Sequence, residues 1–399
     1  MGINPLNNAG TLNNIGGSPP WVLKMVPVLV SAPKLLNSLT NTGLIGVYQS
    51  ILNNAGTLNN IGGSIQVGNQ STLTNTSTLN NIGGTIVINN GAFGLTNNGT
   101  LYNDSTSTIS SIFGGINNTG TLNNGQQATP GSGLNNSGTI NNSGTLNNGS
   151  FGTITNTGTI NNIPGGSLNN SGTLNNSGTI NNRGTFTNSG AVTISNSSQF
   201  TTTTNYTQTA GSTIVNGTLT GTGSVIVNIQ GGTLSGTGVV NGNVVMAGIM
   251  SPGDATGVGN FTIHGDYTQT STGTLQEQVG WLNGCNTSLF TVNGVANLNG
   301  TLALSLLSGY DPTAGDSFIL MTFLSDYGSF NTVTGLNLGN NLFFDLIYDP
   351  HDIRVEVESQ SMATPEPNSF LLVLGCVPIL VLYRKRLAAM MANTFGIAS

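Results

Sequence analysis

Three side chains that are able to bind a metal ion come closest together in the segment SPGDATGVGNFTIHGD, which carries Asp254, His264 and Asp266. Carboxylate and imidazole groups are the usual ligands of divalent metals, but these three residues lack an established ligand spacing. We therefore interpret them as polar residues of loops between strands. The sequence predicts no metal and no cofactor here.

The second histidine, His351, lies between Asp349 and Asp352 and follows a Tyr-Asp-Pro turn signal, so we predict a turn and not a site. Cys285 has no histidine near it in sequence, and Cys376 lies in an apolar run. The two cysteines are 91 positions apart in segments of different character, which argues against a disulfide. We predict no cysteine nucleophile.

An enzyme acting on polysaccharide needs clustered carboxylates, or carboxylates beside Arg or Lys. Between residues 35 and 250 the chain has one acidic residue, Asp104, and one basic residue, Arg183. Gly-x-Gly pairs such as Gly221 and Gly223 have no helix pattern after them and no nearby Lys, so they predict no phosphate site. We predict a non-enzymatic protein, with a β-helix polysaccharide-active enzyme as the alternative.

Charged residues make up only 5% of the 399 residues, and the formal net charge is −6. Nucleic-acid affinity depends mainly on Lys and Arg, and Arg183 is the one such residue between positions 35 and 353, so no nucleic-acid partner is expected. Tracts of Gly, Asn, Ser and Thr are also typical of disorder, which is the alternative to a fold. Against disorder, 36% of the residues are hydrophobic, and Leu and Ile recur at regular intervals.

The chain is an array of repeats. The segment LNNAGTLNNIGGS at residues 6–18 recurs unchanged at residues 52–64, and the smallest unit is six residues, as in LNNSGT followed by INNSGT. A larger period also emerges. Its units start 21 or 22 residues apart, at Leu52, Leu73, Leu95 and Ile116. Three short strands per turn fit this length.

Strand geometry turns the aliphatic residue of each Thr-Leu-Asn triplet inward and its two neighbours outward. A single unit buries little, but stacked units bury a continuous file of Leu and Ile, each contributing about 1.5–3 kcal/mol. Gly and Asn tolerate positive φ and so suit corners such as NNSG and NNIGG, and aligned Asn side chains can form ladders. The sequence predicts an all-β fold, a parallel β-helix with about seven coils over residues 52–200.

Composition divides the chain into segments. The repeats change at Thr201 to longer Val, Ile and Thr runs, in which Tyr206-Thr-Gln and Tyr267-Thr-Gln use the same element twice. We expect an irregular repeat start with an apolar insertion (1–51), an Asn-Gly-Thr-Leu solenoid (52–200), its Gly/Val/Thr-rich continuation (201–279), a β-rich cap (280–358), a linker (359–369), a short transmembrane helix (370–383) and a basic stop with a tail (384–399).

The C-terminal segment carries Pro365, Glu366 and Pro367, then the apolar run 370–383, then Arg384, Lys385 and Arg386. In this order they resemble the PEP-CTERM sorting signal of Gram-negative and related bacteria. The resemblance implies that a membrane exosortase recognises the Pro-Glu-Pro motif, that residues 370–383 enter the membrane, and that the basic cluster stops translocation. As a helix this run reaches about 21 Å, less than the hydrocarbon core of about 30 Å, so a weak tail anchor is the alternative.

Residues 236–330 are similar in pattern to the passenger-associated repeats of autotransporter-like adhesins, with the phrases GDYTQ, VNGVANLNGTLALSL and GYDPTAGDSFILM. The strand pattern of a translocating barrel does not follow, so export would use a general signal peptide. Met1 begins inside a repeat, and the apolar insertion at residues 19–36 is broken by Pro27 and Pro33. We expect the true start to lie upstream, or the sequence to be a fragment.

These observations predict an exported structural or adhesive protein of the cell surface or biofilm matrix. Its expected partners are an exosortase-like membrane enzyme, exopolysaccharide or other surface proteins, and the membrane through the C-terminal helix. An ice-binding solenoid is a further alternative, and it requires Thr-x-Thr on one strand of every coil.

Overall fold

The computed structural model describes residues 11–14, 22–25, 38–49, 51–89, 91–104, 106–125, 132–253, 259–282, 285–286 and 288–360. Within these ranges the regular secondary structure consists of β-strands, and nearly all strand pairings are parallel. This confirms the predicted all-β parallel β-helix. No helix of the described ranges has the length and apolar character needed to cross a membrane. The transmembrane helix expected at residues 370–383 lies outside them and stays a prediction.

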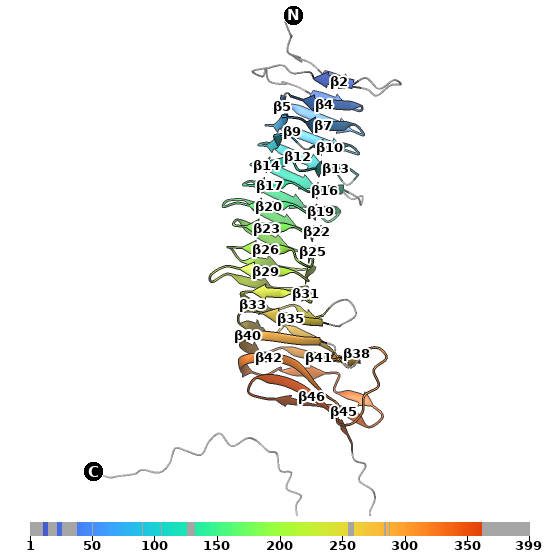
Figure 1. Cartoon of the computed structure of the whole chain (residues 1–399), viewed down its shortest axis with the longest axis vertical. Coiled ribbons are helices and arrows are strands. Elements are labelled where there is room, and N and C mark those ends of the chain that lie inside the picture. Colours follow the sequence, from blue (N-terminus) through green and yellow to red (C-terminus); the bar gives the residue numbers. More distant parts are fainter. Residues whose placement is uncertain are drawn as a thin grey trace, which may run out of the picture. The chain divides into compact units, whose positions relative to one another are not determined.

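Three strands form each coil, and from β3 to β34 each strand pairs in parallel with the strand three positions later in the chain. Figure 1 shows the coils stacked in sequence order, from β2 near the N-terminal end to β45 and β46. The solenoid therefore has three faces, named here face 1, face 2 and face 3.

Face 1 begins at β5 and ends in the first half of a long strand, β40. Its members are β5 (Ile51–Asn54), β8 (Thr72–Asn75), β11 (Gly94–Asn97), β14 (Gly115–Asn118), β17 (Thr139–Asn142), β20 (Thr159–Asn162), β23 (Thr179–Asn182), β26 (Gln199–Thr202), β29 (Thr218–Gly221), β32 (Val239–Asn241), β35 (Gly259–Ile263) and β40 (Ser288–Leu298).

Face 2 ends in the second half of β40. Its other members are β1 (Thr11–Asn14), β3 (Ser38–Asn41), β6 (Thr57–Ile61), β9 (Thr78–Ile82), β12 (Thr100–Asn103), β15 (Thr121–Asn124), β18 (Thr145–Asn148), β21 (Ser167–Asn170), β24 (Thr185–Asn188), β27 (Tyr206–Gln208), β30 (Ile226–Ile229), β33 (Asn243–Met246) and β36 (Tyr267–Gln269).

Face 3 is a separate sheet. Its members are β2 (Val22–Met25), β4 (Leu44–Tyr48), β7 (Ser64–Gly68), β10 (Thr85–Ile88), β13 (Thr108–Ser111), β16 (Ser132–Asn136), β19 (Gly152–Asn156), β22 (Thr173–Asn176), β25 (Ala191–Ile194), β28 (Ser212–Val215), β31 (Thr233–Gly236), β34 (Ile249–Pro252), β37 (Thr274–Val279), β41 (Thr301–Leu306) and β43 (Thr332–Thr334).

The aliphatic columns predicted from the repeats are present. Along face 1 the strand register places one apolar side chain of each coil on that of the next. All are buried, and they are Leu52, Leu73, Leu95, Ile116, Ile140, Ile160, Ile180 and Phe200. Residues 52–200 thus make seven coil-to-coil steps on this face, as the period indicated.

A second inward position is occupied by asparagine. Strands such as β17, with the sequence Thr-Ile-Asn-Asn, alternate half-buried and buried residues, so the last Asn faces the core. Asn142 donates from Nδ2 to Asn162 Oδ1 at 2.7 Å and accepts from Asn118 Nδ2 at 2.7 Å. It also donates to Ser167 O of the next coil at 2.9 Å and to Gly144 O at 3.1 Å. The predicted ladders exist, and they run inside the solenoid.

Such internal ladders follow all three faces. Consecutive Nδ2–Oδ1 distances lie between 2.6 and 2.8 Å. The members on face 1 are Asn54, Asn75, Asn97, Asn118, Asn142, Asn162 and Asn182; on face 2 they are Asn41, Asn60, Asn81, Asn103, Asn124, Asn148, Asn170 and Asn188; on face 3 they are Asn136, Asn156 and Asn176.

The corner glycines correct part of the sequence interpretation. In NNIGG corners Gly62 and Gly83 have φ of +66° and +61°, as expected. In NNSG corners the glycine does not adopt positive φ; instead, a Cβ on Gly144 would lie 2.0 Å from Gly120 O of the preceding coil. Glycine is required there because two backbones approach closely, not because the chain turns left-handed.

The C-terminal part of the described chain changes pairing mode. Strands β40 and β41 still pair in parallel with β35 and β37. Beyond them, β42 (Ser317–Gly328) pairs antiparallel with β46 (Asp352–Ser359), and β46 pairs antiparallel with β45 (Leu342–Tyr348), which pairs with β44 (Asn337–Gly339). A short hairpin, β38 (Trp281–Leu282) and β39 (Cys285–Asn286), projects from this region. Antiparallel strands at this end (Figure 1) occupy the edge that another parallel coil would otherwise need.

Replacing an inward ladder residue is expected to cost more stability than replacing its outward neighbour. Asn142→Ala removes the acceptor of Asn118 Nδ2 and the donor to Asn162 Oδ1. Because buried polar groups then lose their partners, we expect the free energy of unfolding to fall by about 2–4 kcal/mol. Asn141→Ala, at the adjacent outward position, should cost less than about 1 kcal/mol, since water replaces its partners. Urea denaturation followed by far-ultraviolet circular dichroism measures both. Equal losses would contradict the ladder's structural role.

The corner glycines give a second test. Gly144→Ala is expected to lower stability by about 1–3 kcal/mol or more, because its Cβ would overlap Gly120 O. Gly115→Ala is the matched control, since the nearest atom to its Cβ would be Thr139 O at 3.9 Å and its φ is not positive. The control variant should melt at or slightly above the wild-type temperature. A stable Gly144→Ala protein would show that the coils can separate at this corner.

Candidate functional site

The residues singled out from the sequence do not gather into one site. The sorting residues Pro365, Glu366 and Pro367, the stop residues Arg384, Lys385 and Arg386, and Asp254 and Cys376 lie outside the described residues. Asp266 Oδ1 accepts from Val295 N at 2.9 Å, and His264 is exposed. Among the described residues no three His, Cys, Asp or Glu side chains are grouped as metal ligands would be.

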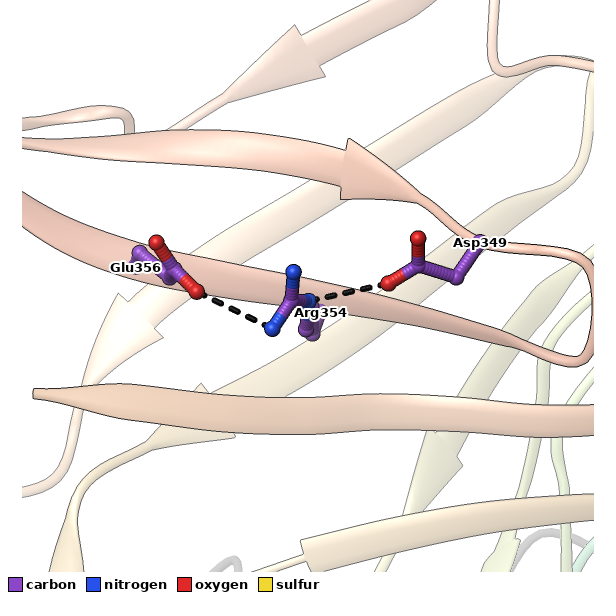
Figure 2. A network of polar contacts seen from close by, with 3 residues as sticks. All are labelled: Asp349, Arg354 and Glu356. Atoms are coloured by element: carbon purple, nitrogen blue, oxygen red, sulfur yellow. Dashed lines mark ion pairs between the residues drawn. The ribbon is translucent and has the colours of Figure 1, made fainter.

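The acidic residues near His351 belong to a turn and to an ion-pair network, and Figure 2 shows the network of Asp349, Arg354 and Glu356. Asp349 N donates to Asp352 O at 2.9 Å, so the predicted turn is present. Arg354 on β46 lies 3.0 Å from Asp349 Oδ2 through Nε and 3.0 Å from Glu356 Oε1 through Nη1. His351 Nδ1 lies 2.9 Å from Leu324 O. Because these side chains are partly exposed, the pairs contribute little to stability.

Asp104, the lone acidic residue of the Asn-rich repeats, closes a loop. Its Oδ1 accepts from Ser107 Oγ, from Gly83 N at 3.2 Å and from Thr106 N at 3.1 Å. Burial raises the pKa of this carboxyl, but the hydrogen bonds outweigh burial and hold the pKa below its usual value. Asp104 is therefore a structural residue that stays ionised.

The outer surface of the Asn-rich coils carries few charged residues, and on face 1 it repeats from coil to coil. On face 1 the outward amides form their own ladder, in which Asn141 donates to Asn117, Asn161 to Asn141 and Asn181 to Asn161, each at 2.9 Å. Outward Thr-x-Thr pairs occur in the described strands only on β8, β19, β24, β29 and β43, never on neighbouring coils of one face. The pattern required for ice binding does not recur coil after coil in these strands.

A groove of about 710 Å³ lies on the outer side of face 3, over β28, β31, β34, β37 and β41. Its floor includes one outward column, formed on successive coils by Ile214, Ser235, Ser251, Gln276 and Ala303. Gln278 and Asn216 lie beside this column. Among the described residues that line the groove there is no Lys, Arg or Asp, and Glu277 is the one acidic residue.

Glu277 is buried, with 1% of its surface exposed. Ser288 Oγ donates to Glu277 Oε2 at 2.5 Å, whereas Oε1 has no hydrogen-bond partner. Burial raises the pKa of this carboxyl to about 8, although the Ser288 hydrogen bond opposes the shift. The pKa of the buried Tyr267 hydroxyl is also raised, by burial first and by Glu277 second. Glu277 is therefore uncharged at neutral pH.

Glu277 is not among the residues singled out from the sequence, although a signal is present. In β37, Leu275, Glu277 and Val279 alternate with Gln276 and Gln278. An acidic residue that alternates with outward residues at the same spacing as two aliphatic residues of its strand faces the core with them. The groove itself has no local signal, because it depends on the side chains of five successive coils.

No protein-family model and no curated protein matches this chain.

The buried carboxyl of Glu277 predicts a specific pH dependence. Its folded pKa of about 8 exceeds the reference value of 4.5, so between these pH values the folded state holds a proton that the unfolded state has lost. This residue therefore lowers the free energy of unfolding as pH rises, by up to about 1.4 kcal/mol per pH unit. Glu277→Gln should remove this dependence and be more stable than wild type at pH 8.

Urea titrations at pH 5, 6.5 and 8 measure the effect. Glu358→Gln is the matched control, because Glu358 is exposed near the end of β46, and it should leave the wild-type dependence intact. Parallel stability curves for wild type and Glu277→Gln would mean that Glu277 is ionised in the folded protein.

Proposed function

We propose that this β-solenoid repeat protein is an exported structural and adhesive component of the cell surface or biofilm matrix. The main supporting observation is the continuous stack of parallel strands. Buried Asn side chains hydrogen-bond to one another along its core, while Thr, Ser and Asn line the outside. A rod of this kind presents many equivalent hydrogen-bonding positions. Contacts that are weak singly become strong when repeated along one ligand.

The surface chemistry supports polysaccharide as the partner. Neutral hydroxyl and amide groups on the outside, such as the Asn117–Asn181 ladder of face 1, both donate and accept hydrogen bonds, as sugar hydroxyls do. With 5% charged residues, the chain lacks the basic surface that polyanions require. The partner proposed is exopolysaccharide or another neutral surface polymer.

We propose a non-catalytic role. Glycosidases use a pair of carboxylates across the scissile bond, whereas Glu277 is the single acidic residue among the described residues that line the groove on face 3. Ser288 and burial hold that carboxyl in place within the core. This chemistry favours binding over cleavage.

The proposed route to the cell envelope uses the C-terminal residues. Pro365, Glu366 and Pro367 are the proposed recognition motif of an exosortase-like enzyme, residues 370–383 the proposed membrane segment, and Arg384, Lys385 and Arg386 the proposed stop. Before processing the protein would be anchored in the membrane with its solenoid outside, because basic residues favour the cytoplasmic side. After processing it would be at the surface or extracellular.

Sorting is tested by production behind a standard secretion signal in a bacterium that has an exosortase. The wild-type chain should appear at the surface or in the matrix in a shortened form. The triple variant Pro365→Ala, Glu366→Ala, Pro367→Ala should stay full-length in the membrane fraction. The matched control, Ser361→Ala, Met362→Ala, Thr364→Ala, should behave as wild type. Cell fractionation and mass spectrometry of the C-terminus measure the outcome, and identical fates for all three proteins would refute the sorting proposal.

A further inference from the structure

The groove on face 3 lies where outward side chains of different size follow one another on successive coils. Register places Ile214 beside Ser235, Ser235 beside Ser251, and Gln276 beside Ala303. The lining residues come from five strands of one sheet, β28, β31, β34, β37 and β41. At the usual spacing of about 4.8 Å between strands, these five strands span about 19 Å along the solenoid axis. Figure 1 shows these coils in the C-terminal part of the stack.

The chemistry of the lining is polar and neutral. Ser235, Ser251 and Asn216 supply half-buried hydroxyl and amide groups, and Gln276 and Gln278 supply exposed amides. An amide both donates and accepts hydrogen bonds, which matches a ligand whose edge carries hydroxyl groups. The lining residues that the structure describes include no Lys or Arg, so they carry no positive charge that would attract an anionic ligand.

Apolar side chains complete the lining. Ile214 lies on the coil at one end of the groove, and Ala303 and Leu304 lie on the coil at the other. The ring faces of sugars carry C–H groups, which pack against such apolar surface while the hydroxyl edge reaches polar groups. A ligand that is polar at its edges and apolar on its faces fits this arrangement.

We propose that the groove on face 3 binds a short stretch of a neutral polysaccharide, with the sugar chain running along the solenoid axis. This assignment rests on the proposed adhesive function and gives it a site and a ligand class. The volume of about 710 Å³ lies in the range of ligand sites and accommodates several sugar rings. Gln276 and Gln278 are the hydrogen-bonding residues with the most exposed side chains on β37.

Glu277 supports the preference for neutral ligands. Glu277 belongs to the groove lining, but its side chain points inward and its carboxyl is buried against Ser288. Because this carboxyl lies in the core, it places no charge on the outer surface of β37. The described residues of the lining thus expose no charged side chain to a ligand.

The experiment is isothermal titration of the full chain with cellohexaose, laminarihexaose and maltohexaose, and with hexagalacturonate as the charged comparator. At least one neutral hexasaccharide should bind, and hexagalacturonate should bind at least about tenfold more weakly. The double variant Gln276→Ala, Gln278→Ala should weaken binding about tenfold, as expected for two lost hydrogen bonds. Ser251→Trp, which fills the groove from its floor, should abolish binding.

Two matched controls separate the groove from the rest of the surface. Gln199→Ala changes an exposed outward Gln on face 1, and Ser167→Trp changes an outward Ser on face 2. Both should bind the hexasaccharide within about twofold of wild type, a difference below the value of one hydrogen bond. Far-ultraviolet circular dichroism checks that every variant is folded, and Gln276→Ala alone replaces the double variant if the latter is not.

The outcomes distinguish the site from the general function. If groove variants and controls bind equally, or if the galacturonate is preferred, the groove assignment is wrong. Retention of wild type on immobilised neutral polysaccharide, unchanged by Ser251→Trp, would keep the adhesive function and locate it elsewhere. If the wild-type chain neither binds a hexasaccharide nor is retained on polysaccharide, both proposals fail.

Discussion

The contact between one coil and the next is the interaction on which the described structure depends. Each strand is hydrogen-bonded to the strands one coil before and one coil after, and a single coil has almost no interior of its own. The columns of Leu and Ile become buried only because the coils are stacked at strand spacing. Corner glycines such as Gly144 permit that spacing, since a larger residue would meet the backbone below it. Stability is therefore a property of the stack.

The internal asparagines add hydrogen bonds, which are directional, to the contact between coils. A primary amide has both a donor and an acceptor, so identical residues can satisfy each other indefinitely along a column. On face 2 the ladder ends where Asn188 Nδ2 donates to Gln208 Oε1 at 3.1 Å, and on face 1 it ends where Asn182 donates to Thr202 Oγ1 at 2.9 Å. An aromatic cluster begins at the same level, with ring centroids of Phe186, Phe200 and Tyr206 4.7–5.4 Å apart. Larger side chains thus replace the ladder as the core filling.

The columns were predictable because one residue type recurs at one position, and periodicity needs no knowledge of tertiary structure. The inward Asn was harder to place, because polarity alone assigns it to the surface or to a corner; only the partners on neighbouring coils make burial favourable. The role of Gly144 was misassigned for a related reason. Local conformational preference suggests positive φ, whereas the constraint is the backbone of Gly120 in another coil. A local sequence pattern indicates contacts within one coil, but it does not indicate contacts between one coil and the next.

The same reasoning explains where a binding site can form. From Leu52 to Phe200 the outward residues of faces 1 and 2 are mostly Asn and Thr on each coil, so those two faces are nearly uniform and periodic. A uniform ladder has no position that differs from its neighbours, and it can offer only repeated weak contacts. Concavity requires side chains of unequal size on adjacent coils, and this condition is met over β28 to β41, where Ile, Ser, Gln and Ala share one column. Unequal outward side chains on these coils therefore allow a groove, and with it selectivity, to exist on this part of the solenoid.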